Sequence, residues 1–329
     1  MPPRQGRAAG RGHYAEPVSS SDRVMLLDSA SLYFRAFYGV PDSLTAPDGT
    51  VVNALRGILD FLATLVEQHE PDAVVACWDD DWRPQWRVDL LPSYKTHRLA
   101  DPASVESGAA PAEESPELLT PQVPLIAEAL DLLGVPVVGR PEAEADDVIA
   151  GIAEAWRGPV DVVTGDRDLF QLVDDERPVR VLYTARGVSR ADVVDAAWLR
   201  AKYGVEPRQY ADFATMRGDT SDGIPGVAGI GEKTAATLLA RFEDLDGILA
   251  AAHDDASDMT PRPRRSLRES EDLVRVMRRV VGVRTDLSDA SVVRPLTVPD
   301  AAQRAVFEEF GARWGLGGTV DRVLTALSH

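Results

Sequence analysis

Short apolar runs alternate with helical stretches along most of this chain. Four runs bounded by turn or charged residues are typical of buried strands, and they are residues 24–27, 73–78, 135–138 and 160–163. Two stripes with the spacing of one helical face consist of Leu55, Leu59, Leu62 and Val66, and of Ile126, Leu130 and Leu133. Strands that alternate with helices predict an α/β fold with a mostly parallel central sheet, flanked by helices on both faces.

The same pattern divides the chain into three regions. Residues 1–22 are rich in Gly, Ala, Arg and Ser without apolar periodicity, which predicts a disordered tail. Residues 23–190 carry the strands and are expected to form an α/β core, with an arch or flexible loop over about 82–120. The strand pattern stops after this region, so residues 191–329 are expected to form a helical lobe.

Composition limits the cellular setting and raises one objection to a nucleic-acid partner. Cys77 is the single cysteine, and the N-terminus lacks an apolar signal-peptide stretch, which favours the cytoplasm. No run approaches the roughly 18 apolar residues of a membrane span. The formal net charge of −18 is unusual for a protein that holds phosphate backbones. The nine acidic residues assigned below account for only half of it.

Acidic residues follow the expected strands or open the next helix. The set consists of Asp28, Asp79, Glu144, Asp146, Asp147, Asp166, Asp168, Asp219 and Asp222. Ligands bind beyond the carboxyl ends of parallel strands, so these side chains are expected to gather at one edge. Each acid alone is better explained as a helix N-cap or a first-turn acid, but together they would repel one another without cations. Oxygen ligands and the lack of a Cys/His cluster favour two or more Mg²⁺ or Mn²⁺ ions over zinc. A pair of such ions promotes the hydrolysis of phosphodiester bonds.

Two motifs point to other enzyme classes. Asp166-Arg-Asp168 after a strand is similar to the nucleophile motif of haloacid-dehalogenase-type phosphatases, but Leu169 and Phe170 follow where that motif has a small residue and Thr or Val. The glycine segment 226–234 is similar to a P-loop, but Glu232 stands where the P-loop spacing requires Lys. The segment is better explained as a turn between two helices, with exposed N–H groups at Gly229 and Gly231 and with Lys233 beside them for a backbone phosphate.

Taken in order, these motifs resemble the 5′ nuclease family, which includes the 5′-to-3′ exonuclease domain of bacterial DNA polymerase I and the flap endonucleases. The resemblance runs from about residue 24 to at least 249. Its most specific part is Asp219-Thr-Ser-Asp222-Gly-Ile-Pro-Gly226-Val-Ala-Gly229-Ile-Gly231-Glu-Lys233-Thr234. The chain departs from the family where Gly223 replaces the usual Asn and where the loop at 101–116 is longer.

The resemblance implies a PIN-like nuclease core and roles for individual residues. Lys95 and Arg87 are expected to steer the scissile phosphate, and the nine acids to bind metal. A helix-three-turn-helix element over about 212–242 is expected to hold duplex DNA, and K⁺ is a candidate ligand there. The DNA-binding residues implied are Arg35, Arg83, Tyr94, Arg98, Gly226, Gly229, Gly231, Lys233 and Thr234.

The implied activity is a two-metal 5′-to-3′ exonuclease and flap endonuclease of replication or repair. Its substrates would be DNA with 5′ ends, flaps or nicks, and it would act as a monomer in cooperation with a polymerase and a ligase. A silent junction-binding protein and a PIN-like ribonuclease remain the alternatives. A basic run between Arg262 and Arg284 is expected to extend the duplex-binding surface.

Overall fold

The structure is a computed structural model that describes residues 19, 22–101 and 113–328. Most of the expected tail, and residues 102–112 of the expected loop, lie outside the described residues. Among the described helices, none combines the length and apolar character of a membrane span.

Six strands form one sheet in the order β3-β2-β1-β4-β5-β6. They are β1 Val24–Asp28, β2 Ala73–Cys77, β3 Val137–Val138, β4 Val160–Thr164, β5 Val179–Tyr183 and β6 Asp192–Val194. Neighbours pair in parallel except β5 and β6, which are antiparallel. The predicted mostly parallel sheet is confirmed. The sequence pattern missed β5 because Arg180 interrupts its apolar run, and this arginine pairs at 2.7 Å with the buried Asp161 of β4.

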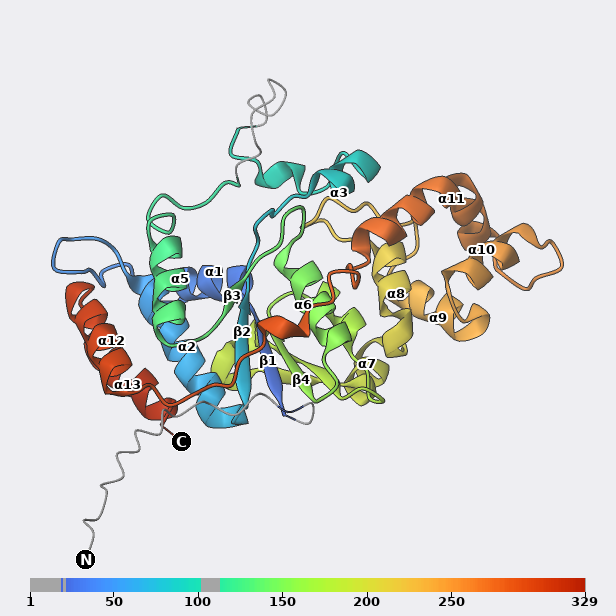
Figure 1. The fold of residues 1–329 in the computed structure, drawn as a ribbon. Helices are drawn as coiled ribbons and strands as arrows, with labels where there is room; N and C mark the ends of the chain where they lie inside the picture. Colours follow the sequence, from blue (N-terminus) through green and yellow to red (C-terminus); the bar gives the residue numbers. More distant parts are fainter. Residues whose placement is uncertain (1–18, 20–21, 102–112, 329) are drawn as a thin grey trace, which may run out of the picture.

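Alternate residues of β1 supply the cores on the two faces of the sheet. Met25 and Leu27 pack with α2 (Asn53–His69), α5 (Gln122–Leu132) and the last two helices, α12 (Ala301–Arg313) and α13 (Gly318–Ala326). Val24 and Leu26 face α6 (Ala145–Ala155) on the other side. The two predicted helical stripes are therefore buried faces of α2 and α5. Helix α1 (Ser29–Gly39) packs against α2 above the carboxyl edge of the sheet (Figure 1).

The helical lobe continues the core that contains α6. It consists of α7 Ala196–Tyr203, α8 Tyr210–Arg217, α9 Glu232–Phe242, α10 Leu245–His253 and α11 Pro261–Val281. Buried residues from all five helices join the cluster that includes Val24 and Leu26. In Figure 1 this lobe lies on the right, and the short α3 (Gln85–Leu90) lies above α6 and contacts α11.

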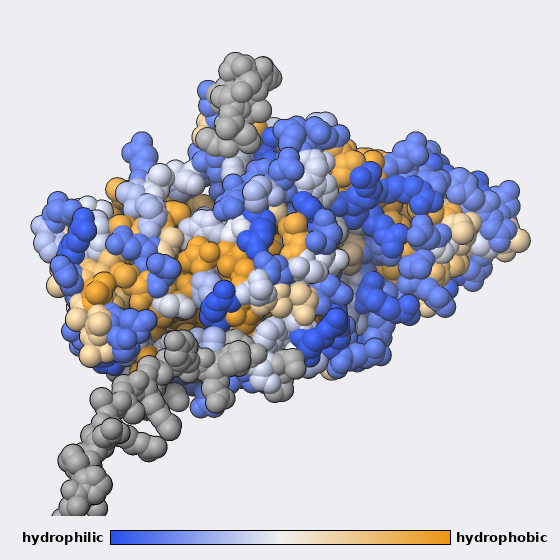
Figure 2. Space-filling model, in the orientation of Figure 1, coloured by the Kyte–Doolittle hydropathy of each residue, from blue (hydrophilic) through white to orange (hydrophobic). Residues whose placement is uncertain are grey.

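The C-terminal part of the chain does not belong to the lobe, contrary to the expected boundary of 191–329. After α11 the chain returns to the sheet, where Leu296 donates a 2.8 Å backbone hydrogen bond to Asp72. Helices α12 and α13 then pack beside α5 and α2, at the opposite end of the molecule from α8–α11 (Figure 1). The apolar stripe of α13 therefore covers the core rather than a lobe. Figure 2 shows mostly hydrophilic residues over the lobe and an apolar area in the middle of the core.

Candidate active site

The centre of the sheet places two acidic segments side by side. β1 lies between β2 and β4, so the strand order reverses there, and ligands of α/β proteins bind at such points. Asp28 closes β1 and caps α1 by accepting a 3.1 Å hydrogen bond from the backbone N–H of Ser31. Its other oxygen accepts a 2.6 Å bond from the hydroxyl of Thr164, the last residue of β4. The loop that carries Asp166 therefore begins beside Asp28.

The N-terminus of α6 brings a second acidic group to the same edge. Asp79 follows β2, and its Oδ1 accepts a 2.7 Å bond from the backbone N–H of Ala145. This contact fixes Glu144, the N-cap of α6, and Asp146 in its first turn. The positive end of the helix dipole faces these carboxylates.

A cavity of about 360 Å³ opens at this edge. Six of the nine predicted acids line it, namely Asp28, Asp79, Glu144, Asp146, Asp166 and Asp219. Lys95, Arg98, Phe34 and Trp82 are among the other residues that line it. In the described ranges, no three acidic, histidine or cysteine side chains stand close enough to hold one metal ion as they are.

Four of the lining carboxylates, those of Asp28, Asp79, Asp146 and Asp166, have no ion pair with a cationic side chain in the described chain. Burial, and then the charge of Asp79, raises the pKa of Asp28 to about 7 against the opposing Thr164 hydrogen bond. Burial also raises the pKa of Asp146 well above its ordinary value, and the charges of Asp166 and Asp28 add to the effect. Uncompensated carboxylates of this kind, buried at Asp28 and half-buried at the other three positions, fit a site for hard cations.

Glu144 and Asp147 are held by cations instead. Burial alone would raise the pKa of Glu144, but Lys95 and Arg87 hold it below its ordinary value. Asp147 is fully buried and accepts bonds of 2.8 and 2.9 Å from the Arg87 guanidinium and a 2.9 Å bond from the backbone N–H of Arg284. Asp147 is not among the residues that line the cavity. Its contacts support a structural position rather than the expected place at a metal.

Arg87 occupies a different place from the one expected of a phosphate-steering residue. It is 3% exposed and bonds Glu144 and Asp147 through its terminal nitrogens. Its Nε donates a 3.1 Å bond to the carbonyl of Val280, at the end of α11. A side chain whose donors are engaged in this way does not reach a substrate in the cavity. Arg87 instead ties α3, α6 and the lobe together.

Arg87→Lys is expected to lower the free energy of unfolding by about 3 kcal/mol, because lysine cannot reproduce the paired bonds and leaves buried Asp147 partly uncompensated. Urea unfolding followed by circular dichroism measures the change. Arg186→Lys is the matched control, since the Arg186 side chain is 68% exposed and pairs only with Asp192. Equal effects of the two substitutions would contradict the role assigned to Arg87.

The segments on either side of α3 contribute a cavity-lining lysine and two buried structural residues. Lys95 lines the cavity, and its ammonium pairs with Glu144 and donates a 3.3 Å bond to the carbonyl of Trp82. Tyr94 is buried and donates a 2.7 Å bond to Glu144. Arg83 is buried and donates a 2.7 Å bond to the carbonyl of Tyr94. The positions of Tyr94 and Arg83 correct the expectation that they contact DNA, because both are used inside the fold.

Arginines surround the remaining acids, which lie on the lobe side. Arg98 pairs with Asp222 at 2.7 Å, and Arg167 and Arg217 each lie 3.6 Å from Asp219. Burial, and then the charge of Asp166, raises the pKa of Asp168 well above its ordinary value, and its Oδ1 is buried without a hydrogen bond. An unsatisfied buried carboxylate oxygen calls for a missing ligand. Asp219 lines the cavity, whereas Asp168 and Asp222 are not among the lining residues.

Glu113 is a lining residue that the sequence pattern did not reveal. It is bridged to Leu99 across the described ends of the loop, and burial raises its pKa. Its place after a Pro/Ala/Ser-rich segment gave no periodic signal. The only sequence feature that could have indicated a lining residue here is an acid immediately before the segment that returns to the core.

The segment around Ser93 touches the glycine hairpin directly. The backbone N–H of Lys95 donates a 3.0 Å bond to the carbonyl of Asp222, and the Ser93 hydroxyl donates a 2.9 Å bond to that of Gly223. A Cβ built on Gly223 would lie 2.2 Å from the Ser93 carbonyl oxygen, and Gly223 has a φ of +71°. The departure from the family's Asn at this position is therefore explained by the close approach of Ser93.

Gly223→Asn is expected to lower the free energy of unfolding by about 2 kcal/mol. Asn tolerates a positive φ, so the loss would come from the clash with Ser93 rather than from backbone strain. Thermal unfolding measures it, with Gly39→Ala as the control because a Cβ on Gly39 meets nothing within 4 Å. An unchanged melting temperature for Gly223→Asn would show that the two segments are not held together.

The glycine hairpin joins α8 to α9, as the sequence predicted. Gly226 and Gly229 have positive φ, and Gly231 is the N-cap of α9. Lys233 and Thr234 lie in the first turn of α9. In the described structure the backbone N–H groups of Gly229 and Gly231 donate no hydrogen bond. Free N–H groups at a helix N-terminus favour an anion.

The basic run from Arg262 to Arg284 is largely neutralised within the lobe. Its ion pairs are Arg264 and Arg268 with Asp255, Arg265 with Glu269, Arg275 with Asp246 and Glu271, Arg278 with Asp212 and Asp246, and Arg284 with Asp286. The run as a whole is therefore not the free basic surface that the sequence suggested.

Arg35 lies on α1 near the cavity. One of its terminal nitrogens is 3.4 Å from a Cβ built on Gly165, and its Nε is buried without a hydrogen bond. A buried, unsatisfied guanidinium N–H beside Gly165 supports the expectation that Arg35 binds an anion.

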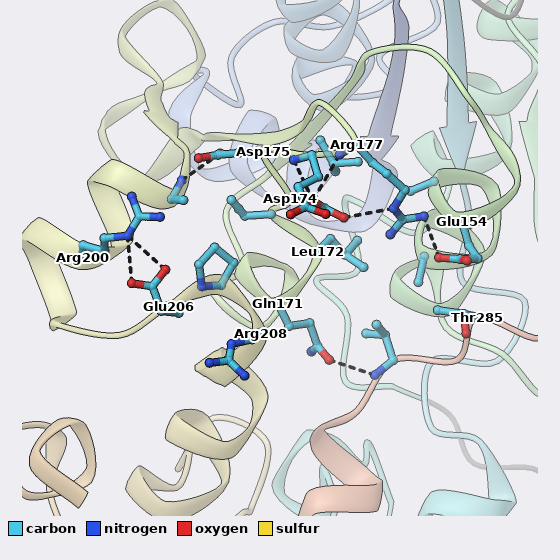
Figure 3. A pocket seen from close by; sticks show the side chains of 18 residues that line it. Glu154, Gln171, Leu172, Asp174, Asp175, Arg177, Arg200, Glu206, Arg208 and Thr285 are labelled. Atoms are coloured by element: carbon cyan, nitrogen blue, oxygen red, sulfur yellow. Dashed lines mark hydrogen bonds and ion pairs between the residues drawn. The ribbon is translucent and has the colours of Figure 1, made fainter. Parts of the chain in front are cut away.

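A larger hollow of about 560 Å³ lies between the core and the lobe. Its charged side chains are mostly paired with each other, as Arg177 is with Glu154 and Asp174, and Arg200 with Glu206 (Figure 3). Within it, the side-chain oxygen of Gln171 accepts a 3.2 Å hydrogen bond from the backbone N–H of Val283. This paired lining makes it a joint between the two parts rather than a site with free chemistry.

Comparison with known proteins agrees with this geometry. Residues 23–204 match the family model of the 5′-3′ exonuclease N-terminal resolvase-like domain, and residues 205–303 match that of the C-terminal SAM fold. A 5′-3′ exonuclease of Streptomyces coelicolor is 55% identical over 92% of this chain and 100% of its own length. One of Mycobacterium tuberculosis is 46% identical over 92% of this chain and 97% of its own length.

Solved structures show the same fold at low sequence identity. The T5 D15 protein, co-crystallised with metal ions, has a TM-score of 0.62 at 17% identity and covers 93% of this chain and 99% of its own. The catalytic core of Rad2 in complex with DNA substrate has a TM-score of 0.57 at 15% identity, covering 95% of each chain. The fold is that of the PIN-like nucleases. Two family models that together span residues 23–303, and full-length relatives of the same kind, show that this chain belongs to the 5′-3′ exonuclease family.

Proposed function

We propose that this nuclease hydrolyses DNA phosphodiester bonds at 5′ ends and 5′ flaps, with divalent cations bound by the acids of the cavity. The observation that supports this function is a set of cavity-lining carboxylates beside Lys95 that have no ion pair in the described chain, namely Glu113 and, among the predicted acids, Asp28, Asp79, Asp146 and Asp166. Their hard oxygen atoms, and the raised pKa values of Asp28, Asp79 and Asp146, suit Mg²⁺ or Mn²⁺.

The residues divide the proposed metal site into two parts. Asp28, Asp79, Asp146 and Asp166 would hold one cation, and Asp168, Asp219 and Asp222 would take part in holding the other. Glu144 and Asp147 position Lys95 and the start of α6 through their bonds to Arg87. When bound, the two cations activate a water and stabilise the leaving oxygen. Lys95 remains charged, because Glu144 outweighs the effect of burial and raises its pKa. From the cavity wall it would contact the scissile phosphate.

The hairpin between α8 and α9 is proposed to hold the duplex next to the cut strand through backbone phosphates. Contacts of this kind fix position without reading sequence. The relatives include DNA polymerase I of Mycobacterium bovis, 38% identical over 69% of this chain and 24% of its own length. We therefore propose that the protein trims 5′ ends left beside a growing strand and leaves nicks for a ligase. The K⁺ ion at the hairpin and the monomeric state stay predictions.

A cleavage assay on a 5′-flapped DNA duplex tests this function. Wild-type protein should cut in Mg²⁺ or Mn²⁺ but not in EDTA, and Asp166→Ala should abolish cutting. Binding of the junction without turnover in either metal would indicate a silent binding protein. Preferential cutting of an RNA flap would indicate a ribonuclease.

A further inference from the structure

Two arginines of α11 differ from the rest of the basic run. In the described structure, Arg262 and Arg279 make no ion pair or hydrogen bond, whereas the other arginines between Arg262 and Arg284 are paired with acids. Both side chains are exposed. An uncompensated guanidinium keeps its full attraction for an external anion, whereas a paired one must first give up its partner.

Arg262 lies against the glycine hairpin. A Cβ built on Gly229 would be 3.1 Å from the Nε of Arg262 and 3.3 Å from one of its terminal nitrogens. Gly229 also has a φ of +78°, so glycine both permits the turn and leaves room for the guanidinium. Arg262 is the second residue of α11, which brings the start of that helix to the hairpin.

The donors around Arg262 point to one kind of ligand. The free N–H groups of Gly229 and Gly231, the N-terminal turn of α9 and the ammonium of Lys233 lie on the same hairpin. Glu232 is the acidic residue within this turn, so Arg262 gives the group a net positive charge. Backbone N–H groups together with a planar guanidinium suit a phosphate.

We propose that Arg262 and the hairpin together bind one backbone phosphate of the duplex, and that Arg262 supplies most of the side-chain charge at that contact. The inference rests on the proposed function, because it assigns a residue to the duplex contact of that nuclease. The paired arginines of α11 serve to hold α8, α10 and α11 together and do not take part.

Arg279 provides a matched control for Arg262. It lies on the same helix and has no ion pair, but it is 17 residues further along. Helix α11 is kinked at Ser270, and Arg279 lies beyond the kink, near the end of the helix. Arg279→Gln therefore removes the same charge from the protein without touching the hairpin.

The test measures the affinity for a fluorescent 5′-flapped DNA duplex at increasing KCl, in Ca²⁺ to limit cutting. Arg262→Gln is expected to weaken binding by about 5- to 10-fold and to reduce the slope of log affinity against log salt by about one. Arg262→Lys should keep the slope, and Arg279→Gln should match the wild type.

An unchanged slope in Arg262→Gln, or an equal reduction in Arg279→Gln, would overturn the inference. Failure of the wild-type protein to bind or cut any flapped duplex would instead refute the proposed function. The two failures are therefore distinct.

Discussion

Asp146→Asn is expected to abolish cleavage and, at the same time, to stabilise the metal-free protein. Asp146 makes no side-chain hydrogen bond in the described structure, and burial together with the charges of Asp166 and Asp28 disfavours its ionised form. Removing that charge should raise the free energy of unfolding in EDTA by about 1 kcal/mol. Loss of a cation ligand should lower kcat by at least about 10³-fold, since a metal contributes several kcal/mol to the transition state.

Opposite changes in stability and activity distinguish the loss of a cation ligand from general misfolding. Urea unfolding in EDTA and single-turnover cleavage in Mg²⁺ give the two quantities. Asp131→Asn, at an exposed position on α5, is the control and should change neither. A destabilised Asp146→Asn protein, or one that cuts like the wild type, would show that Asp146 does not belong to a charge cluster that binds cations.

Lys95→Ala is expected to reduce kcat by about 10²- to 10³-fold, the usual effect of removing one donor that stabilises transition-state charge. Lys95 is the lysine among the residues that line the cavity. Burial lowers the pKa of its ammonium group, but the charge of Glu144 raises it further, so Lys95 stays protonated. Affinity for the flapped duplex should hardly change, because the duplex contact is assigned to the hairpin.

Lys233→Ala is the opposite control for Lys95→Ala. Lys233 lies in the first turn of α9, away from the cavity lining, so its loss should weaken duplex binding with little effect on the single-turnover rate. Filter binding and quenched-flow cleavage measure the two effects. If both variants lost affinity equally and kept their rates, Lys95 would be a binding residue and would not stabilise the transition state.

Much of the site was predictable from sequence because parallel strands end at one edge of a sheet. Each short apolar run followed by an acid placed one carboxylate there, as for Asp28 after β1 and Asp79 after β2. The glycine hairpin was predictable for a similar reason, since positive φ at Gly226 and Gly229 demands glycine.

Sequence reasoning failed where the role of a charge depends on its partners. Arg87 and Lys95 look alike as basic residues of one segment, but Arg87 is buried against Asp147 and Lys95 faces the cavity. The basic run of α11 likewise gave no sign that acids such as Asp246 and Asp255 neutralise it. The return of residues 282–300 to the sheet left no periodic signal, so α13 was assigned to the lobe instead of to its place on α2.

The proposed function requires that cations bound in the cavity promote cleavage of DNA next to a duplex that the hairpin holds. Mapping of the products from a flapped duplex, with the flap strand end-labelled and Mg²⁺ added to metal-free protein, tests this requirement directly. We expect cutting at or next to the junction, dependent on the added metal and absent in Asp146→Asn. Cuts scattered along single-stranded DNA, or the same products in EDTA, would contradict it.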